Sequence, residues 1–301
     1  MCHQKVCIVT DASANIPKEL KKSYNITVIP VPVFLGMEVF KIHDENHKLP
    51  PNKFYKKLSD LDEPPATSQP PSGDFIKTYK QLLTQKQVKN LISIHLSEKL
   101  SGLYYHALRI SKMFGGKLGI KKVKIFDSST VGIGLGNLII EAAQMAEKGR
   151  YPWRIIHRCR KLRKKVNCLY FMDSLNFLTQ TGRIGSAVSL GKTIKKENEK
   201  AIIRINRGIV HPVGVINSSW EGILKKLIDE ISNQLIRKRI LLSYTLGKEK
   251  LGKRIYNYIK EKDPKLTVHL IKSNVAINTH LGSKCFGISW FGKFKESWLD
   301  L

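Results

Sequence analysis

The sequence predicts an α/β protein of two domains, with a largely parallel sheet in the N-terminal domain and an α+β arrangement in the C-terminal domain. In the first half, short apolar runs alternate with stretches of helical periodicity, which is the order that builds parallel sheets. In the second half, Asn206-Arg207-Gly208 separates two apolar runs and indicates a hairpin, which joins antiparallel strands. With 301 residues the chain is long enough for two cores, which we assign to residues 1–160 and 161–301.

The strands expected in the first half end in turns of small polar residues. Residues 6–10 form an apolar run that stops at Asp11-Ala12-Ser13-Ala14-Asn15, and Pro17 then suits the first turn of a helix. Residues 26–34 have the composition of a second strand, which Pro30 and Pro32 place at a sheet edge because proline cannot donate to the ladder. The later elements are strands at 91–96 and 123–126 and helices at 51–58, from 75, at 103–113 and at 135–147.

A stiff loop precedes the helix expected from Phe75. Prolines flank the triplet Thr67-Ser68-Gln69 on both sides, so this backbone is extended and cannot begin a helix. Ser72-Gly73-Asp74 can cap the helix that follows. The hydroxyls of Thr67 and Ser68 would then lie beside a helix N-terminus, where free N–H groups and the helix dipole favour an anion. A proline-rich surface turn is the alternative interpretation.

The second half has a different order of elements. A basic helix is followed by an apolar strand and a short helix, then by the loop Thr181-Gly182-Arg183-Ile184-Gly185 and a helix to about residue 194. After the hairpin, helices and strands alternate, and the chain closes with Asn278-Thr279-His280-Leu281-Gly282 and an apolar strand to Trp290. The strands are expected at 168–172, 201–205, 209–215, 240–244 and 267–271, and the helices at 175–178, 219–236 and 247–262.

The charge is strongly unbalanced, with 52 Lys and Arg against 24 Asp and Glu and a formal net charge of +28. Such a field favours polyanions, so a basic nucleic-acid-associated protein is the alternative function that we keep open. Evenly spread lysines on solvated faces are the simpler explanation. The helix around 154–165 is the densest basic cluster, but no aromatic stacking pattern accompanies it, and we expect no specific nucleic acid as a partner.

Three features of the sequence indicate the cellular compartment. No apolar run approaches the ~18 residues of a membrane span, and the N-terminus reaches Asp11 before a signal-peptide core could form. The five cysteines are odd in number and include no CxxC pair, which indicates reduced structural thiols. We therefore expect a cytoplasmic protein without a disulfide framework or a metal site.

Two nucleotide-binding signatures are incomplete. Gly132-Ile133-Gly134-Leu135-Gly136 follows a strand, but Asn137 stands where the dinucleotide fingerprint needs its last glycine. Gly191-Lys192-Thr193 resembles the end of a P-loop, but Ser186 replaces its first glycine. We expect no nucleotide cofactor and no catalytic residues in this chain, and a stand-alone phosphotransferase is only a third hypothesis.

A set of hydroxyls remains as the candidate site. They lie on loops that can converge at the carboxyl ends of the strands, where parallel sheets bind ligands. Hydroxyls are directed donors that bury no charge, so such a set fits a carboxylate held at the end of an apolar cavity. On their own, His280 and Arg183 are more simply a core or loop histidine and a surface cation. The hydroxyls belong to Ser13, Thr67, Ser68, Ser97 and Ser101.

Several motifs spread over almost the whole chain carry a family resemblance. They are Val9-Thr10-Asp11-Ala12-Ser13-Ala14-Asn15-Ile16-Pro17, Thr67-Ser68-Gln69-Pro70, Ser93-Ile94-His95-Leu96-Ser97-Glu98-Lys99-Leu100-Ser101-Gly102-Leu103-Tyr104, Asp127-Ser128, Gly182-Arg183-Ile184 and Thr279-His280-Leu281-Gly282. In this order they resemble the DegV family of fatty-acid-binding proteins, which includes the lipid-carrying subunits of bacterial fatty acid kinase.

The resemblance implies a DegV-like fold with a long-chain fatty acid, such as palmitate, in a cavity between the domains. It implies that Thr67 and Ser101 hold the carboxylate, that His280 lies near this head group and that Arg183 contacts a kinase catalytic subunit. We expect Ser13, Ser68 and Ser97 to support the pocket. The chain would then be a carrier rather than an enzyme, with transient contact to an anionic membrane surface.

The sequence departs from the family pattern at three places. Ala12 replaces a serine that usually follows the first aspartate, and Thr181 replaces the glycine that usually precedes the Gly-Arg-Ile motif. The C-terminal turn, usually rich in glycine and proline, is Gly282-Ser283-Lys284-Cys285 here. This last change places a lysine close to the expected head-group end.

Overall fold

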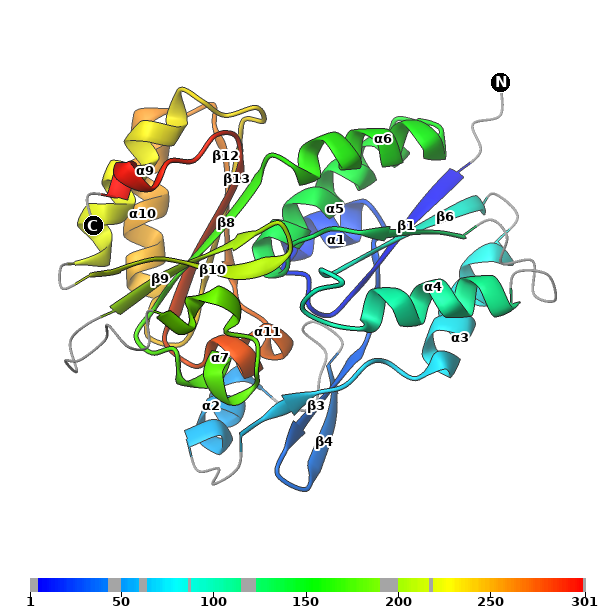
Figure 1. Ribbon diagram of the computed structural model, residues 1–301. Helices are drawn as coiled ribbons and strands as arrows, with labels where there is room; N and C mark the ends of the chain where they lie inside the picture. Colours follow the sequence, from blue (N-terminus) through cyan, green and yellow to red (C-terminus); the bar gives the residue numbers. More distant parts are fainter. Residues whose placement is uncertain are drawn as a thin grey trace.

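The computed structural model describes residues 5–42, 50–59, 64–85, 88–114, 123–189, 200–216 and 219–299. Figure 1 shows the arrangement of its elements. The first half builds a four-stranded, fully parallel sheet in the order β2-β1-β6-β7, which confirms the parallel sheet predicted for this region. The strands are β1 (Lys5–Asp11), β2 (Thr27–Ile29), β6 (Val88–His95) and β7 (Val123–Asp127), and the main helices are α3 (Ser72–Leu83), α4 (Leu103–Phe114), α5 (Gly132–Glu147) and α6 (Pro152–Arg163).

The second half builds a separate six-stranded sheet in the order β10-β9-β8-β13-β11-β12. It mixes parallel and antiparallel pairs and contains the predicted hairpin between β9 and β10. Helices α9 (Trp220–Ser232) and α10 (Glu249–Lys262) bury an apolar face against this sheet. The strands are β8 (Val166–Met172), β9 (Lys200–Asn206), β10 (Ile209–Ile216), β11 (Arg239–Tyr244), β12 (Thr267–Lys272) and β13 (Cys285–Phe291).

Helix α5 lies between the two large sheets (Figure 1). Leu135 and Ile139 pack with residues of the N-terminal sheet, whereas Ile133 and Ile140 pack with residues of the C-terminal sheet. The helix therefore buries apolar side chains on two faces, one against each sheet. The division into residues 1–160 and 161–301 stays a prediction, and α5 joins the two sheets across it.

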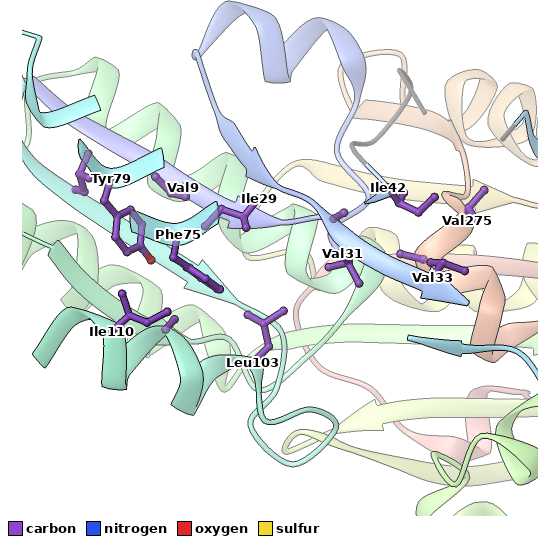
Figure 2. Close-up of a cluster of buried hydrophobic side chains, with 14 of the residues drawn as sticks. Val9, Ile29, Val31, Val33, Ile42, Phe75, Tyr79, Leu103, Ile110 and Val275 are labelled. Carbon is purple, nitrogen blue, oxygen red and sulfur yellow. The ribbon is translucent and has the colours of Figure 1, made fainter. Parts of the chain in front are cut away.

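A third, smaller sheet was not predicted. Its strands pair antiparallel in the order β4-β3-β5, and they are β3 (Val31–Leu35), β4 (Glu38–Ile42) and β5 (Ala66–Thr67). The prediction of one strand over 26–34 was wrong, because β2 ends at Ile29 and Pro30, which cannot donate to the ladder, separates it from β3. Side chains of β3 pack into a core that reaches Phe75, Tyr79 and Val275 (Figure 2).

The start of α3 also differs from the prediction. The helix begins at Ser72 rather than at Phe75, and no side chain caps it. The hydroxyl of Ser72 instead lies 3.4 Å from Nε2 of His106, and Asp74, in the first turn, pairs with Lys41 at 3.4 Å. In the segment before α3, Thr67 lies in β5, whereas residues 68–71 belong to no helix or strand.

The closing segment of the chain contains a helix. Residues 278–282, to which the sequence analysis gave no element, mostly belong to α11 (Val275–Leu281), which packs on β3, β5 and α7 (Asn176–Gln180). The helix expected to reach residue 194 is described only as far as a short 3-10 turn (Gly185–Ala187) and the two residues after it, and Gly191-Lys192-Thr193 lies outside the described residues. Among the described helices, none has the length and apolar character needed to cross a membrane.

Candidate functional site

A cavity of about 460 Å³ is lined by residues from both halves of the chain. Its volume lies within the range of small-molecule pockets, roughly 300–1,000 Å³. One part of the lining is apolar and includes Leu103, Leu178, Ile205, Val210 and Ile277. The polar part gathers most of the predicted site residues and consists of Asp11, Ser13, Thr67, Ser68, Gln69, Ser101, Arg183 and His280.

Thr67 and His280 meet in this cavity although 213 positions separate them. Thr67 is on β5 and His280 is on α11, and these elements pack on each other. The hydroxyl Oγ1 of Thr67 lies 2.9 Å from Nε2 of His280. The other ring nitrogen, Nδ1, is buried and has no hydrogen-bond partner among the described residues. The pair therefore offers a polar end to a cavity that is otherwise largely apolar.

The His280 ring is neutral at physiological pH. Burial, and to a lesser extent the nearby positive charge of Arg183, lowers its pKa from 6.5 to about 4. A neutral imidazole carries one proton, so one ring nitrogen donates and the other accepts. If Nε2 carries the proton, it donates to Thr67 and leaves the threonine hydroxyl free to donate to a ligand.

Ser101 lines the same cavity from the turn before α4. Its Oγ accepts a hydrogen bond from the Leu103 backbone N–H at 3.2 Å, so the hydroxyl proton is available to another acceptor. Gly102, which follows, lies against the Gln69 side chain, because a Cβ there would lie 2.5 Å from Nε2 of Gln69. The two loops that carry Thr67 and Ser101 are thus packed directly against each other.

Ser13 lines the cavity, but its hydroxyl is already engaged. Its Oγ and backbone N–H both donate to Oδ1 of Asp11, the N–H at 2.9 Å. The turn that carries Ser13 is fixed to the start of α5, where the Gly132 N–H donates to the Ser13 carbonyl at 3.0 Å. A Cβ at Gly136 would meet the Asn15 carbonyl oxygen at 2.0 Å. Of the glycines that resembled a dinucleotide fingerprint, Gly132 and Gly136 therefore lie against this turn, whereas Gly134 packs against Thr130 and Cys168.

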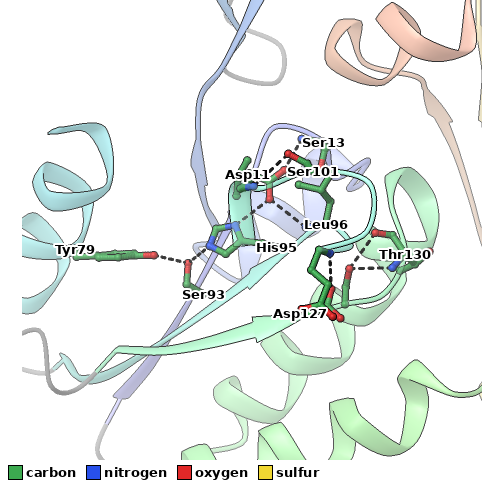
Figure 3. Close-up of polar contacts among 12 residues, drawn as sticks. Asp11, Ser13, Tyr79, Ser93, His95, Leu96, Ser101, Asp127 and Thr130 are labelled. Carbon is green, nitrogen blue, oxygen red and sulfur yellow. Dashed lines mark hydrogen bonds and ion pairs between the residues drawn. The ribbon is translucent and has the colours of Figure 1, made fainter. Parts of the chain in front are cut away.

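Asp11 belongs to a buried polar chain that the sequence analysis missed (Figure 3). Its Oδ2 lies 2.9 Å from Nδ1 of His95, whose Nε2 lies 2.8 Å from the Ser93 hydroxyl, and Tyr79 donates to that hydroxyl at 2.9 Å. All four side chains are buried. The sequence did contain a signal, because Ser93 and His95 alternate on one face of an otherwise apolar strand. These hydrogen bonds fix Asp11, and through it Ser13, at the edge of the cavity.

The other two residues that were predicted to support the pocket, Ser97 and Ser68, lie in different places. Ser97 does not line the cavity, which corrects that expectation, since its buried hydroxyl donates to the Gly208 carbonyl at 2.8 Å. It thereby ties the tip of the β9–β10 hairpin to the end of β6. Ser68 does line the cavity, but it is exposed and its hydroxyl is 3.4 Å from the Gln69 carbonyl.

Arg183 also reaches the cavity, from the loop after α7. Its Nη1 donates to the Thr181 carbonyl at 2.5 Å, and the side chain is exposed. Arg183 therefore contributes an exposed positive charge to the cavity wall.

The basic helix α6 is partly structural. Arg163 donates to the Asp127 carbonyl at 2.9 Å, and Arg158 lies 3.9 Å from the buried carboxylate of Glu141. Exposed aromatic residues do occur at its start, where the Arg154 guanidinium lies 5.1 Å from the centre of the Trp153 ring. Part of this helix's charge thus stabilises the fold rather than an external contact.

Comparison with known proteins agrees with the sequence resemblance. A family model described as "Uncharacterised protein, DegV family" matches residues 5–293. A DegV domain-containing protein of Halalkalibacterium halodurans is 29% identical over 293 residues, which cover 95% of this chain and 98% of that protein. Protein DegV of Bacillus subtilis is 28% identical over 289 residues, with 95% and 98% of the two chains covered.

Solved structures share the whole fold. The crystal structure of DegV from Bacillus subtilis, a fatty acid binding protein, matches with a TM-score of 0.80 and 28% identity over 96% of this chain and 100% of that one. A fatty-acid-binding DegV family protein from Thermus thermophilus matches with a TM-score of 0.82 and 23% identity, over 96% of this chain and 100% of that chain. The described sheets and the family match over residues 5–293 lead to one conclusion: this chain belongs to the DegV family.

Proposed function

We propose that this chain binds one long-chain fatty acid in the cavity and carries it without itself catalysing a reaction. The observation that carries the proposal is the cavity itself, which is apolar over much of its wall and ends at the hydrogen-bonded pair Thr67 and His280. The relative from Bacillus subtilis, 28% identical, is a fatty acid binding protein.

The energetics favour an acyl chain of this kind. Burying about 14 methylene groups at ~0.8 kcal/mol each contributes on the order of 11 kcal/mol before ordering costs are subtracted. A carboxylate that entered the same cavity without hydrogen bonds would cost several kcal/mol. The head group therefore needs donors, and the apolar wall alone does not specify a fatty acid.

The proposed donors are the hydroxyls of Thr67 and Ser101. Ser101 uses its oxygen to accept from Leu103, which leaves its proton for the carboxylate. Thr67 can donate to the carboxylate when His280 carries its proton on Nε2 and donates to Thr67. In this arrangement His280 orients Thr67 and remains neutral, in agreement with a pKa lowered to about 4. Ser13 and Ser68 support the same end of the cavity.

The carboxylate of Asp11 does not exclude an anionic ligand. It accepts hydrogen bonds from Ser13 and from the Leu96 N–H and lies 2.9 Å from the His95 ring, so its oxygens are turned away to protein partners. Arg183 lies on the cavity wall and contributes a positive charge. Among the described residues, no carboxylate lies within ion-pair distance of Arg183, so its positive charge is available to an anionic ligand.

A binding experiment with matched ligands tests the head-group assignment. Protein freed of lipid by organic extraction is titrated with palmitate and with methyl palmitate, which has the same chain but no negative charge. We expect palmitate to bind at least ten times more tightly. Equal affinities would show that the cavity binds the chain but that the Thr67 end does not hold a carboxylate.

We further propose that the carrier presents the carboxylate to a separate kinase catalytic subunit in the cytoplasm. The exposed Arg183 at the cavity is the residue best placed for that contact. Arg183→Ala is expected to lower acyl-phosphate formation by the mixture at least tenfold while palmitate affinity changes less than threefold. Arg109→Ala, which removes an exposed arginine from α4, is the matched control. If the Arg183 variant supports acyl-phosphate formation at the wild-type rate, Arg183 does not take part in the contact with the kinase subunit.

A further inference from the structure

Another hollow, of about 520 Å³, lies at the C-terminal end of α11, where Leu281, Gly282 and Ser283 form part of its wall. Its lining includes Lys200, Lys248 and Lys284 together with the single carboxylate of Asp173. Leu281 lines both this hollow and the cavity, and Phe177 of α7 closes against the end of α11, because a Cβ at Gly282 would lie 2.6 Å from its ring. We call this hollow the lysine pocket.

The topology of the C-terminal sheet gathers these charges at one end. Strand β8 runs antiparallel to both β13 and β9, so Asp173, just after β8, meets Lys284, just before β13, and Lys200, at the start of β9. Met172 is paired in register with Cys285 and with Ala201. Lys248 lies in the turn that follows β11, and β11 pairs with β13 on the side opposite to β8.

One of the three lysines is held in place. The Lys248 Nζ lies 3.1 and 3.4 Å from the two carboxylate oxygens of Asp173 and 3.9 Å from the centre of the Trp220 ring. The Lys200 Nζ lies 5.7 Å from the same ring. Trp220 is only 4% exposed, and its indole N–H has no acceptor among the described residues. The pocket is thus built around a fixed ammonium group rather than formed by mobile surface lysines alone.

The charges in the pocket are not balanced. Asp173 pairs with Lys248, and among the described residues no carboxylate lies within ion-pair distance of Lys200 or Lys284. Three ammonium groups and one carboxylate leave two positive charges in a concave site, where the field is concentrated. Lysine binds phosphate as a point charge, and the hydroxyls of Ser174 and Ser283 in the same lining can add hydrogen bonds.

We propose that the lysine pocket is a binding site for a phosphate-type dianion. The charge surplus equals the charge of such a group, and the volume exceeds that of phosphate alone, so the site can accept a phosphate that is part of a larger molecule. Two sources share this chemistry, a free phosphorylated compound and the head group of a phosphorylated lipid. The proposal does not rest on the proposed fatty-acid function, because the lining of the lysine pocket shares only Leu281 with that of the cavity.

The test follows the indole N–H signal of Trp220 by NMR, identified through Trp220→Phe, while pyrophosphate is added at constant ionic strength. We expect a saturable shift, and we expect Lys248→Gln and Lys284→Gln each to weaken pyrophosphate binding at least tenfold. Lys262→Gln is the matched control, because Lys262 also pairs with an aspartate, Asp229, and lies over an aromatic ring elsewhere on the surface. Lys284→Gln breaks no described contact, so a loss of binding there does not reflect unfolding.

A second arm distinguishes the two sources. Hexadecylphosphonate and palmitate are bound to lipid-free protein with and without the Lys248→Gln change. If only hexadecylphosphonate loses affinity, the phosphate belongs to a lipid head group. If neither changes but pyrophosphate binding is lost, the source is a free compound. Pyrophosphate binding that is absent, or that is equal in the Lys248 and Lys262 variants, would overturn the proposal.

Discussion

Replacing Thr67 by valine removes one hydroxyl and keeps the shape of the side chain. Two hydrogen bonds depend on this oxygen in our account, the one to Nε2 of His280 at 2.9 Å and the one to the bound carboxylate. Leaving a buried polar group without its partner costs about 1–3 kcal/mol. The dissociation constant for palmitate should therefore rise roughly fivefold to 150-fold. The fold should persist, because β5 pairs with β3 through backbone hydrogen bonds.

The assay is titration of lipid-free protein with palmitate, and the matched control is Thr84→Val. Thr84 is exposed at the end of α3, and its hydroxyl donates only to the Gln81 carbonyl, at 2.9 Å. Methyl palmitate serves as the second ligand, since it should respond less to the Thr67 change. If Thr67→Val binds palmitate as tightly as the Thr84 variant does, the carboxylate lies at another end of the cavity and the reasoning is refuted.

Three further outcomes follow from the same geometry. Ser101→Ala should weaken palmitate binding by about 1–3 kcal/mol in titrations. It should also lower the free energy of unfolding, measured in urea, by about 0.5–2 kcal/mol, because it removes the acceptor for the Leu103 N–H. His280 is neutral when folded, with a pKa of about 4 against 6.5 when unfolded, so only the unfolded state takes up its proton as the pH falls through this window. Lipid-free wild type should therefore lose stability between pH 6.5 and 4, and His280→Gln should lose less, whereas equal losses in urea unfolding would contradict the burial of this ring. The net charge of +28 should give weak RNA binding that disappears as salt is raised to physiological strength, and a tight complex with one RNA in a gel-shift assay would instead favour a nucleic-acid function.

Much of the fold could be predicted because its pattern is local. The apolar runs of β1, β6, β7 and β8 are bounded by polar turns, and the hairpin at Arg207 and Gly208 has a direct sequence signal. The third sheet could not be predicted in the same way. Its strand β4 is five residues long and mostly exposed, and β5 has two residues, so pairing with β3 rather than local propensity defines both.

The site could be predicted only as a set of residue types. The sequence analysis named Thr67, Ser101, His280 and Arg183, and the structure brings all four to one cavity. It could not predict which hydroxyls are already engaged, because that depends on contacts between distant segments. Ser97 is the clearest case, since its partner is the carbonyl of a residue 111 positions away.

The central claim is that a single acyl chain occupies the cavity. Denaturing mass spectrometry of the protein as purified, with organic extraction and quantification of released fatty acid, tests it most directly. The account predicts one long-chain fatty acid per chain, and its displacement by added palmitate. Protein that releases no acyl chain and takes up neither palmitate nor oleate would contradict the account.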